Sequence, residues 1–397
     1  MNLPSQFVSR TKALLGNEWP AFESALNAES PVSIRLNRKK LHVTDYESQE
    51  PQIISGKVPW ATDAFYLKSR PVFTLDPLFH AGCYYIQEAS SMFLEHFIRQ
   101  YVCAPVRALD LCAAPGGKAT HLSSVLPEGS LLVANEVIRS RVPVLVENLV
   151  KWGNPDTVVI NSDSSEIGRL TGFFDIIVCD LPCSGEGMFR KNPASVAEWS
   201  VENVQLCSER QRRIVADVFP ALKPGGILIY STCTYNREEN EENIDRICNE
   251  LGAELLEPPR RFMIHMTKGE GFFIAGMRKL VNISNPDCLR LNSLKIIYDG
   301  RETVETWKKY PVPPHALAMS TGLPKNAFPS WELDRQTALE YLHRDVLRNI
   351  PADIPKGFVL VTYKNQPLGF VKNIGTRANN LYPNQWRIRM AIPIVGS

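Results

Sequence analysis

Two cysteines stand fifty residues apart in surroundings that suit chemistry. Cys183 lies in Asp-Leu-Pro-Cys-Ser-Gly (residues 180–185) and Cys233 in Ser-Thr-Cys-Thr-Tyr (residues 231–235), and each follows an apolar run typical of a buried strand. Upstream is Ala-Ala-Pro-Gly-Gly-Lys (residues 113–118), a small-residue loop of the kind that holds a nucleotide-like cofactor. A cofactor loop with two strand-end thiols predicts covalent chemistry on an electrophilic ring, with one thiol as the nucleophile.

Pyrimidine rings fit this chemistry. Cytosine and uracil have an electron-poor carbon 6, and a thiolate that adds there makes carbon 5 nucleophilic enough to attack a methyl sulfonium. A base then removes the carbon 5 proton and the thiol is eliminated. A nearby cation would help to deprotonate the thiol, and Lys118, Arg190 and Lys191 are the candidates. We expect Asp180 to hydrogen-bond the ring and stabilise charge during addition. Spacing alone does not rank one thiol over the other.

The small-residue loop has features of a cofactor site. It follows a predicted strand (106–111) and precedes a helix, so it lies where ligands bind in a doubly wound sheet. Small residues allow close approach of the backbone, and a helix N-terminus favours a negative group. The loop has neither Gly-x-Gly-x-x-Gly nor P-loop spacing, which disfavours dinucleotides and nucleoside triphosphates.

Two acids follow the next two predicted strands. Glu136 is placed to accept hydrogen bonds from ribose hydroxyls and Asp163 to contact an adenine amine, although each alone is better explained as a helix cap or a solvated residue. The loop and the two acids all fall at the ends of successive predicted strands. Together they favour S-adenosylmethionine, which has a carboxylate, a ribose and an adenine but no phosphate. The predicted cofactor contacts are Cys112, Ala113, Ala114, Pro115, Gly116, Gly117, Lys118, Glu136, Arg141, Asp163 and Asp180.

Strand and helix patterns alternate through the middle of the chain. Short apolar runs separated by helices predict a parallel, doubly wound, Rossmann-like α/β sheet. The expected strands span 106–111, 131–135, 157–160, 174–180 and 227–232, with a hairpin-type strand at 271–278. The expected helices span 84–99, 120–126 and 140–150.

The flanking segments have other patterns. Residues 1–75 are expected to form a small α+β domain with helices at 4–15 and 19–26 and a strand at 32–37. The predicted catalytic domain covers 76–279, and the Pro-rich segment 280–330 is interpreted as a linker or subdomain. Residues 331–397 are expected to form a β-rich module with a helix at 334–347 and strands at 357–363, 366–371 and 386–392.

Composition limits the function classes. No run of about 18 apolar residues predicts a membrane span, and the first residues lack a signal-peptide pattern. Nine scattered cysteines without zinc-site spacing indicate free thiols in a reducing cytoplasm and no metal. Residues 280–397 carry 15 Lys and Arg against 9 Asp and Glu, and no Asp or Glu follows Asp353. A basic tail on a neutral body suits a nucleic-acid enzyme, although a basic surface without a partner has the same composition.

These motifs carry a family resemblance. The loop at 113–118, Asp-Leu-Pro-Cys-Ser-Gly-Glu-Gly at 180–187, and Ser-Thr-Cys-Thr at 231–234 with Glu-Asn-Glu at 239–241 resemble the Sun/Nop-type RNA cytosine carbon-5 methyltransferases, from Tyr84 through Lys279. The resemblance implies a seven-stranded methyltransferase sheet and S-adenosylmethionine as cofactor. One departure is Leu181, where the family usually has Ala; it removes no reactive group.

The resemblance also implies roles. Cys233 matches the family's nucleophile and Cys183 the thiol that assists release of the methylated product, whereas DNA cytosine methyltransferases attack with the Pro-Cys thiol. Asp180 matches an acid that contacts cofactor and base. The loop at 112–118, Glu136 and Asp163 match cofactor contacts.

The carboxyl end resembles the PUA-like module of bacterial small-subunit rRNA methyltransferases, through residues 357–363, 367–372 and 379–383. The expected function is therefore carbon-5 methylation of a cytosine in rRNA, by a monomer. Two alternatives stay open: the same reaction on tRNA, and a catalytically silent rRNA-binding assembly factor. The intact thiols, Asp180 and cofactor loop disfavour the silent factor.

Overall fold

The computed structural model describes residues 1–397 except 45, 47–50, 281–290, 301–306, 308–310 and 394–397. Parts of the expected linker at 280–330 and the end of the expected module at 331–397 therefore lie outside the described residues. The division of the chain at residues 75, 279 and 330 stays a prediction.

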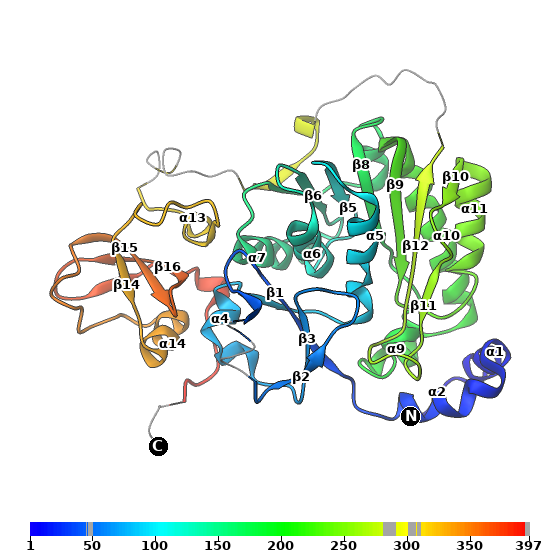
Figure 1. The fold of residues 1–397 in the computed structure, drawn as a ribbon, viewed down its shortest axis with the longest axis horizontal. Helices are drawn as coiled ribbons and strands as arrows, with labels where there is room; N and C mark the ends of the chain where they lie inside the picture. Colours follow the sequence, from blue (N-terminus) through cyan, green and yellow to red (C-terminus); the bar gives the residue numbers. More distant parts are fainter. Residues whose placement is uncertain (45, 47–50, 281–290, 301–306, 308–310, 394–397) are drawn as a thin grey trace.

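The central sheet contains nine strands of the described chain, in the order β10-β12-β9-β8-β5-β6-β7-β13, with β11 paired to β12 (Figure 1). Strands β5 to β9 run parallel, and β12 and β13 run antiparallel to their neighbours. The strands are β5 (Arg107–Asp110), β6 (Leu131–Asn135), β7 (Thr157–Ile160), β8 (Phe174–Asp180), β9 (Leu222–Thr232), β10 (Ala253–Leu255), β11 (Arg260–Phe262), β12 (Phe272–Lys279) and β13 (Ile296–Asp299). The doubly wound α/β fold is confirmed, and β11 and β13 extend the expected seven strands.

Helices cover both faces of this sheet because its strands are apolar on both sides. Ala108 of β5 belongs to a core shared with α5, α6 and α7, and the next residue, Leu109, belongs to a core shared with α8, α10 and α11. These helices and α9 are α5 (Leu94–Tyr101), α6 (Gly117–Val125), α7 (Val142–Trp152), α8 (Ser164–Gly168), α9 (Ala194–Glu198), α10 (Val201–Val218) and α11 (Glu241–Leu251). The carboxyl ends of β5 to β9 meet at one edge of the sheet.

The described part of the first ninety residues contributes three helices and a small antiparallel sheet of order β2-β3-β1-β4. The elements are α1 (Ser5–Leu15), α2 (Trp19–Leu26), β1 (Val32–Leu36), β2 (Ile54–Lys57), β3 (Ala64–Leu67), α4 (Pro77–His80) and β4 (Tyr84–Ile86). Helices α1 and α2 pack on the catalytic body, where Phe22 meets Tyr235 edge-to-face with ring centroids 5.2 Å apart. Two residues before Tyr235 is Cys233, so the amino-terminal helices support the loop that carries this thiol.

The carboxyl-terminal module is a second four-stranded sheet, of order β14-β15-β16-β17, at the left of Figure 1. Its elements are α13 (His315–Met319), β14 (Ser330–Glu332), α14 (Arg335–His343), β15 (Gly357–Tyr363), β16 (Gln366–Asn373) and β17 (Ala378–Asn380). It shares one hydrophobic core with the amino-terminal sheet, including Phe65 and Tyr84 from one and Val359 and Tyr382 from the other.

Short 3₁₀ turns link these elements. They span Gly16–Glu18, Phe73–Leu75, Ser90–Phe93, Arg139–Arg141, Glu186–Met188, Phe219–Ala221, Leu291–Ser293 and Asn384–Trp386. No helix within the described ranges combines the length and the apolar character that crossing a membrane requires.

Two sequence predictions of secondary structure are wrong. The expected helix at 84–99 begins only at Leu94, because Tyr84–Ile86 pairs with β1 as strand β4. The expected strand at 386–392 is absent from the described structure: Trp386 ends a 3₁₀ turn, and the third strand of the module is instead β17. The expected helix at 334–347 is shorter, since α14 ends at His343.

Candidate active site

The loops after β8 and β9 bring the two thiols into contact. The sulfur atoms of Cys183 and Cys233 lie 3.0 Å apart, and both residues are free, partly exposed cysteines. The backbone N–H of Cys233 also donates to the Cys183 sulfur at 3.3 Å. Because β8 and β9 are neighbouring parallel strands, residues fifty positions apart meet at one sheet edge. Both thiols can therefore face one substrate.

The contact between the two sulfur atoms affects the pKa of Cys183. The hydrogen bond with Cys233, together with burial, raises the pKa of Cys183 well above the usual range for a thiol. Cys183 therefore keeps its proton, and its S–H can donate to the Cys233 sulfur and stabilise negative charge there.

Lys118 and Asp180 form an ion pair beside the thiols. Their side chains meet at 2.7 Å, and Asp180 also accepts a hydrogen bond from the Ser231 hydroxyl at 2.8 Å. Burial acts to lower the pKa of Lys118, but the Asp180 carboxylate acts to raise it. The net result is a raised pKa, so the ammonium stays charged. Ser231 lies two residues before Cys233, so the Lys118–Asp180 pair adjoins the loop that carries this thiol. Of the predicted cations, this is the one placed at the site.

Arg190, by contrast, is engaged elsewhere. Its guanidinium pairs with Glu270 at 3.1 Å and donates to the Gly269 carbonyl at 2.7 Å. Lys191 is exposed and lines a cavity beside that pair. We therefore find no contact in the described structure that supports direct activation of a thiol by Arg190 or Lys191.

Two buried carboxylates brace the thiol loops. Glu186 accepts hydrogen bonds from the Thr234 hydroxyl at 2.7 Å, from the backbone N–H groups of Tyr235 and Asn236 at 2.8 and 2.9 Å, and from the Trp199 indole at 2.9 Å. The Cys183 loop thereby holds the Cys233 loop through a single side chain. Gly187 tightens the contact, because an added Cβ would lie 2.4 Å from the Gly271 carbonyl oxygen and 2.9 Å from that of Cys233.

Glu239 is the second brace. It accepts from the Ser184 backbone at 3.0 Å, from the Gln211 amide at 2.8 Å and from the Asn236 amide at 2.7 Å. The polar run at 237–243 suggests a solvated helix start, but Glu239, Asn240 and Asn243 are buried. Their partners lie on other elements, which is why local polarity does not reveal them.

The predicted cofactor loop lies between β5 and α6. Gly116 precedes α6 with φ of 120°, a conformation that favours glycine, and an added Cβ would lie 3.3 Å from the Asn148 Cβ. The Asn148 amide donates to the Pro115 carbonyl at 2.7 Å, and Arg141 donates to that of Ala114. Residues 112–118 are thus held from α7 and its preceding turn.

The strand-end acids differ in burial. Glu136 is buried after β6, accepts from the Ile138 backbone at 2.8 Å and lies 3.3 Å from Arg141, yet one of its oxygens has no hydrogen bond within the described chain. Asp163 is exposed and caps α8 by accepting from the Ser165 backbone at 3.0 Å. Its cap role is therefore explained without a ligand.

Asp110 is a site residue that the sequence reasoning missed. It ends β5, is fully buried, and neither carboxyl oxygen has a well-aligned hydrogen-bond partner among the described residues. Burial, followed by repulsion from Asp180, raises its pKa to about 7. Its position inside an apolar strand run was the available signal, because a buried acid at a strand end is a frequent mark of a site.

Comparison with known proteins places this geometry in a family. Residues 105–278 match the family described as 16S rRNA methyltransferase RsmB/F, residues 3–89 the N-terminal domain of 16S rRNA methyltransferase RsmF, and residues 328–388 the methyltransferase RsmF PUA domain. The chain belongs to the RsmB/F family of 16S rRNA methyltransferases. It is an RNA methyltransferase.

Individual relatives agree with this family. Ribosomal RNA small subunit methyltransferase F of Serratia proteamaculans is 29% identical, with 96% of each chain covered, and that of Vibrio cholerae is 32% identical over 72% of this chain and 66% of the relative. A solved methyltransferase homolog from Pyrococcus horikoshii is 30% identical with a TM-score of 0.62, covering 70% of this chain and 95% of that one. NSun6 from Pyrococcus horikoshii, solved with SFG, has a TM-score of 0.61 at 19% identity over 70% of this chain and 99% of that one, which supports the fold alone.

The pKa of Asp110 makes a prediction about stability. Between pH 3.8 and about 7, Asp110 keeps its proton in the folded chain and releases it in the unfolded chain. Proton binding therefore stabilises the fold at low pH, and this contribution is lost as the pH rises through 7. We expect Asp110→Asn to gain about 2–3 kcal/mol relative to the wild type between pH 5 and pH 8. Calorimetric unfolding of both proteins across this range would measure it.

Asp163→Asn is the matched control for this experiment. Hydrogen bonds from Ser165 lower the pKa of Asp163, so its contribution changes only at more acidic pH. Its difference from wild type should be constant from pH 5 to 8. An Asp110→Asn difference that is equally constant would contradict the assignment of a raised pKa.

Proposed function

We propose that this enzyme methylates carbon 5 of a cytosine in small-subunit rRNA, with S-adenosylmethionine as methyl donor and through a covalent bond between Cys233 and carbon 6 of the ring. The observation that carries the proposal is the contact between the Cys183 and Cys233 sulfurs at 3.0 Å, beside the Lys118–Asp180 ion pair. Paired thiols at a strand edge have no evident use in a methyl transfer that lacks a covalent enzyme adduct.

The chain's residues divide the work. Cys233 attacks carbon 6, and its thiolate is favoured by the Lys118 cation and by the protonated Cys183 thiol. Asp180 hydrogen-bonds the ring nitrogen or amino group, so that charge which develops during addition is stabilised. Once carbon 5 carries the methyl group, a base takes the carbon 5 proton and the bond between carbon 6 and the Cys233 sulfur breaks, which restores the ring and the thiolate. Cys183 assists this departure. The resemblance to the Sun/Nop-type enzymes supports this order of roles.

The carboxyl edge of the sheet also suits S-adenosylmethionine. Asp110 and Glu136 each have a buried carboxyl oxygen that accepts no hydrogen bond within the described residues, and an added Cβ at Gly116 would lie 3.3 Å from the Asn148 Cβ. Unpaired buried acceptors are costly, so a ligand that donates hydrogen bonds to them is expected. The residues that would hold it are the loop at 112–118 with Glu136, and Arg141 and Asp163 at its margin. When bound, this cofactor supplies an electrophilic methyl group.

Ribosomal RNA is the favoured substrate over tRNA. The matches to the RsmF amino-terminal and PUA domains support it, as do the relatives named for the small subunit. The target cytosine must leave any helix to reach the thiol. A silent assembly factor is disfavoured because the two thiols of the proposed mechanism contact each other and Lys118 pairs with Asp180.

The test is direct. The protein is incubated with methyl-labelled S-adenosylmethionine and either small ribosomal subunits, naked small-subunit rRNA or tRNA, and the label is mapped to a nucleotide. We expect 5-methylcytosine at a defined rRNA position. Label on another base or on another cytosine atom would contradict the chemistry, and label confined to tRNA would contradict the substrate.

A further inference from the structure

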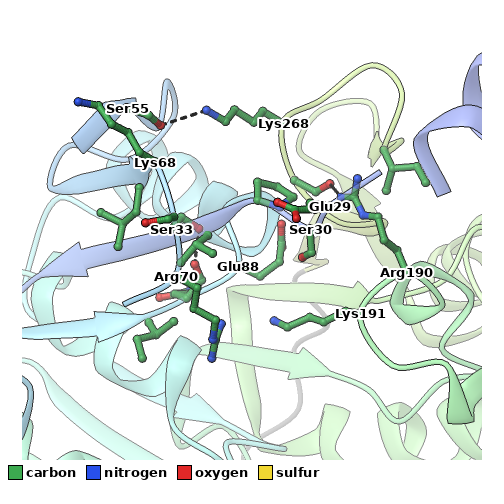
Figure 2. A pocket seen from close by; sticks show the side chains of 18 of the residues that line it. Glu29, Ser30, Ser33, Ser55, Lys68, Arg70, Glu88, Arg190, Lys191 and Lys268 are labelled. Carbon is green, nitrogen blue, oxygen red and sulfur yellow. Dashed lines mark hydrogen bonds between the residues drawn. The ribbon is translucent and has the colours of Figure 1, made fainter. Parts of the chain in front are cut away.

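A basic groove separates the amino-terminal sheet from the catalytic body. It is a cavity of about 1060 Å³, larger than most sites for single small molecules, which hold about 300–1,000 Å³. One wall comes from β1, β4 and the segment after β3, and the other from the segments around residues 190 and 268. Figure 2 shows Lys68 and Arg70 on one side and Lys191 and Lys268 on the other, with the Lys191 ammonium pointing toward the Arg70 side.

The four cations of this groove are not neutralised. Lys68, Arg70, Lys191 and Lys268 are exposed, and none forms a salt bridge with a carboxylate of the described chain. The hydrogen bond of Lys268 goes to the neutral Ser55 hydroxyl at 3.2 Å.

The acids of the lining are few or already engaged. Glu88 has its oxygens taken by the backbone N–H groups of Ser90, Ser91 and Glu270 at 2.8 Å each. Of the lining acids, only Glu29 is exposed. The groove therefore presents a surplus of positive charge that suits a polyanion.

Two residues of the groove lining adjoin segments of the reactive centre. Lys191 lies eight residues after Cys183 on the same loop, whose Glu186 and Gly187 are bound to the Cys233 loop. On the other wall, Gln87 lines the groove and packs 4.0 Å from the position of a Cβ on Gly117 in the cofactor loop. A strand lying in the groove would thus lead to both the thiols and the cofactor edge.

We propose that this groove binds the phosphate backbone of single-stranded RNA next to the target cytosine. The proposal rests on the proposed function, because a flipped base at Cys233 requires an unpaired strand that enters and leaves the site. Cations on both walls of a groove track the phosphates of such a strand without reading its sequence. The groove is separate from the PUA module, so the chain holds its RNA at two places.

The test measures RNA binding by fluorescence anisotropy, with a labelled single-stranded RNA of about 12 nucleotides, a length that one groove can hold. Lys68→Ala/Arg70→Ala and Lys191→Ala/Lys268→Ala remove one wall each. We expect each pair to raise the Kd about tenfold, and the slope of log K against log salt to fall by about 0.7 for each lost phosphate contact. The control pair is Arg169→Ala/Arg246→Ala, which removes two exposed cations from the α8 and α11 side.

Calorimetry with S-adenosylmethionine, together with thermal unfolding, accompanies each variant. A folded variant that retains cofactor affinity and loses RNA affinity supports the groove. The proposal is overturned if both groove variants bind the RNA with the affinity and salt slope of the control variant. It is also overturned if the substitutions weaken binding of an acidic peptide and leave RNA binding unchanged. If the groove variants lose RNA while the wild type makes no 5-methylcytosine, the proposed function fails and the groove stands.

Discussion

Replacing Cys233 by Ala is expected to lower methyl transfer by at least about 10³-fold, because the covalent route disappears and a barrier increase of about 4 kcal/mol follows. Cys183→Ala is expected to leave attack on the ring possible but to slow release, so that protein and RNA accumulate as a covalent adduct. Labelled methyl incorporation measures the first effect. A denaturing gel that retains the protein–RNA adduct measures the second.

Cys103→Ala is the matched control, since Cys103 is a free, exposed cysteine away from the site. It should match the wild type in both assays. An adduct that forms with Cys233→Ala and not with Cys183→Ala would reverse the two roles and give the Pro-Cys thiol the attack, as in DNA cytosine methyltransferases. The protonated state of Cys183 argues against that outcome.

Replacing Glu186 by Ala is expected to cost about 3–5 kcal/mol of unfolding free energy. Four donors on the Cys233 loop and on Trp199 would lose their buried acceptor, and each buried unpaired donor costs about 1–3 kcal/mol, with partial relief from relaxation and water. The measurement is thermal or urea unfolding, together with the methyl transfer rate, which should fall because the Cys233 loop loses its support.

Glu198→Ala, on an exposed face of α9, is the control and should be near neutral. Glu186→Gln keeps one acceptor oxygen but brings an amide donor against other donors, so an intermediate loss is expected. This variant keeps the test meaningful if the Ala variant does not fold. Equal unfolding free energies for Glu186→Ala and Glu198→Ala would show that the carboxylate does not brace the loops.

The central sheet was predictable because its strands are short, apolar on both faces and separated by helical patterns. Strands β5 to β9 all overlap the ranges expected from the sequence. The strand Tyr84–Ile86 was missed because its partner, β1, lies about fifty residues away, and pairing at that distance leaves no local pattern. Residues 386–392 alternate apolar and basic side chains like a strand, but Ile388 is buried and its N–H bonds the Leu342 carbonyl at 3.0 Å instead of a ladder.

The site was predictable as far as strand ends allow. Sequence placed Cys183, Cys233, Lys118 and Asp180 at neighbouring strand ends. In the structure Cys183 contacts Cys233, and Lys118 contacts Asp180. Spacing could not rank the two thiols, because their burial and their contact across fifty residues of sequence are properties of the fold. The bracing acids Glu186 and Glu239 stayed hidden for the same reason, since the donors come from two separate segments for Glu186 and from three for Glu239.

The core shared by the amino-terminal and carboxyl-terminal sheets has a consequence for synthesis. The hydroxyl of Tyr382, a member of that core, meets a His80 ring nitrogen at 3.3 Å across 302 positions of sequence. The amino-terminal half of this core therefore lacks its apolar partner until nearly the whole chain has been synthesised. Closing so long a loop carries an entropic cost that grows only slowly with length, but the exposed half is open to aggregation in the interval. A chain interrupted late in translation would keep its thiols and cofactor edge and yet leave the amino-terminal sheet uncovered.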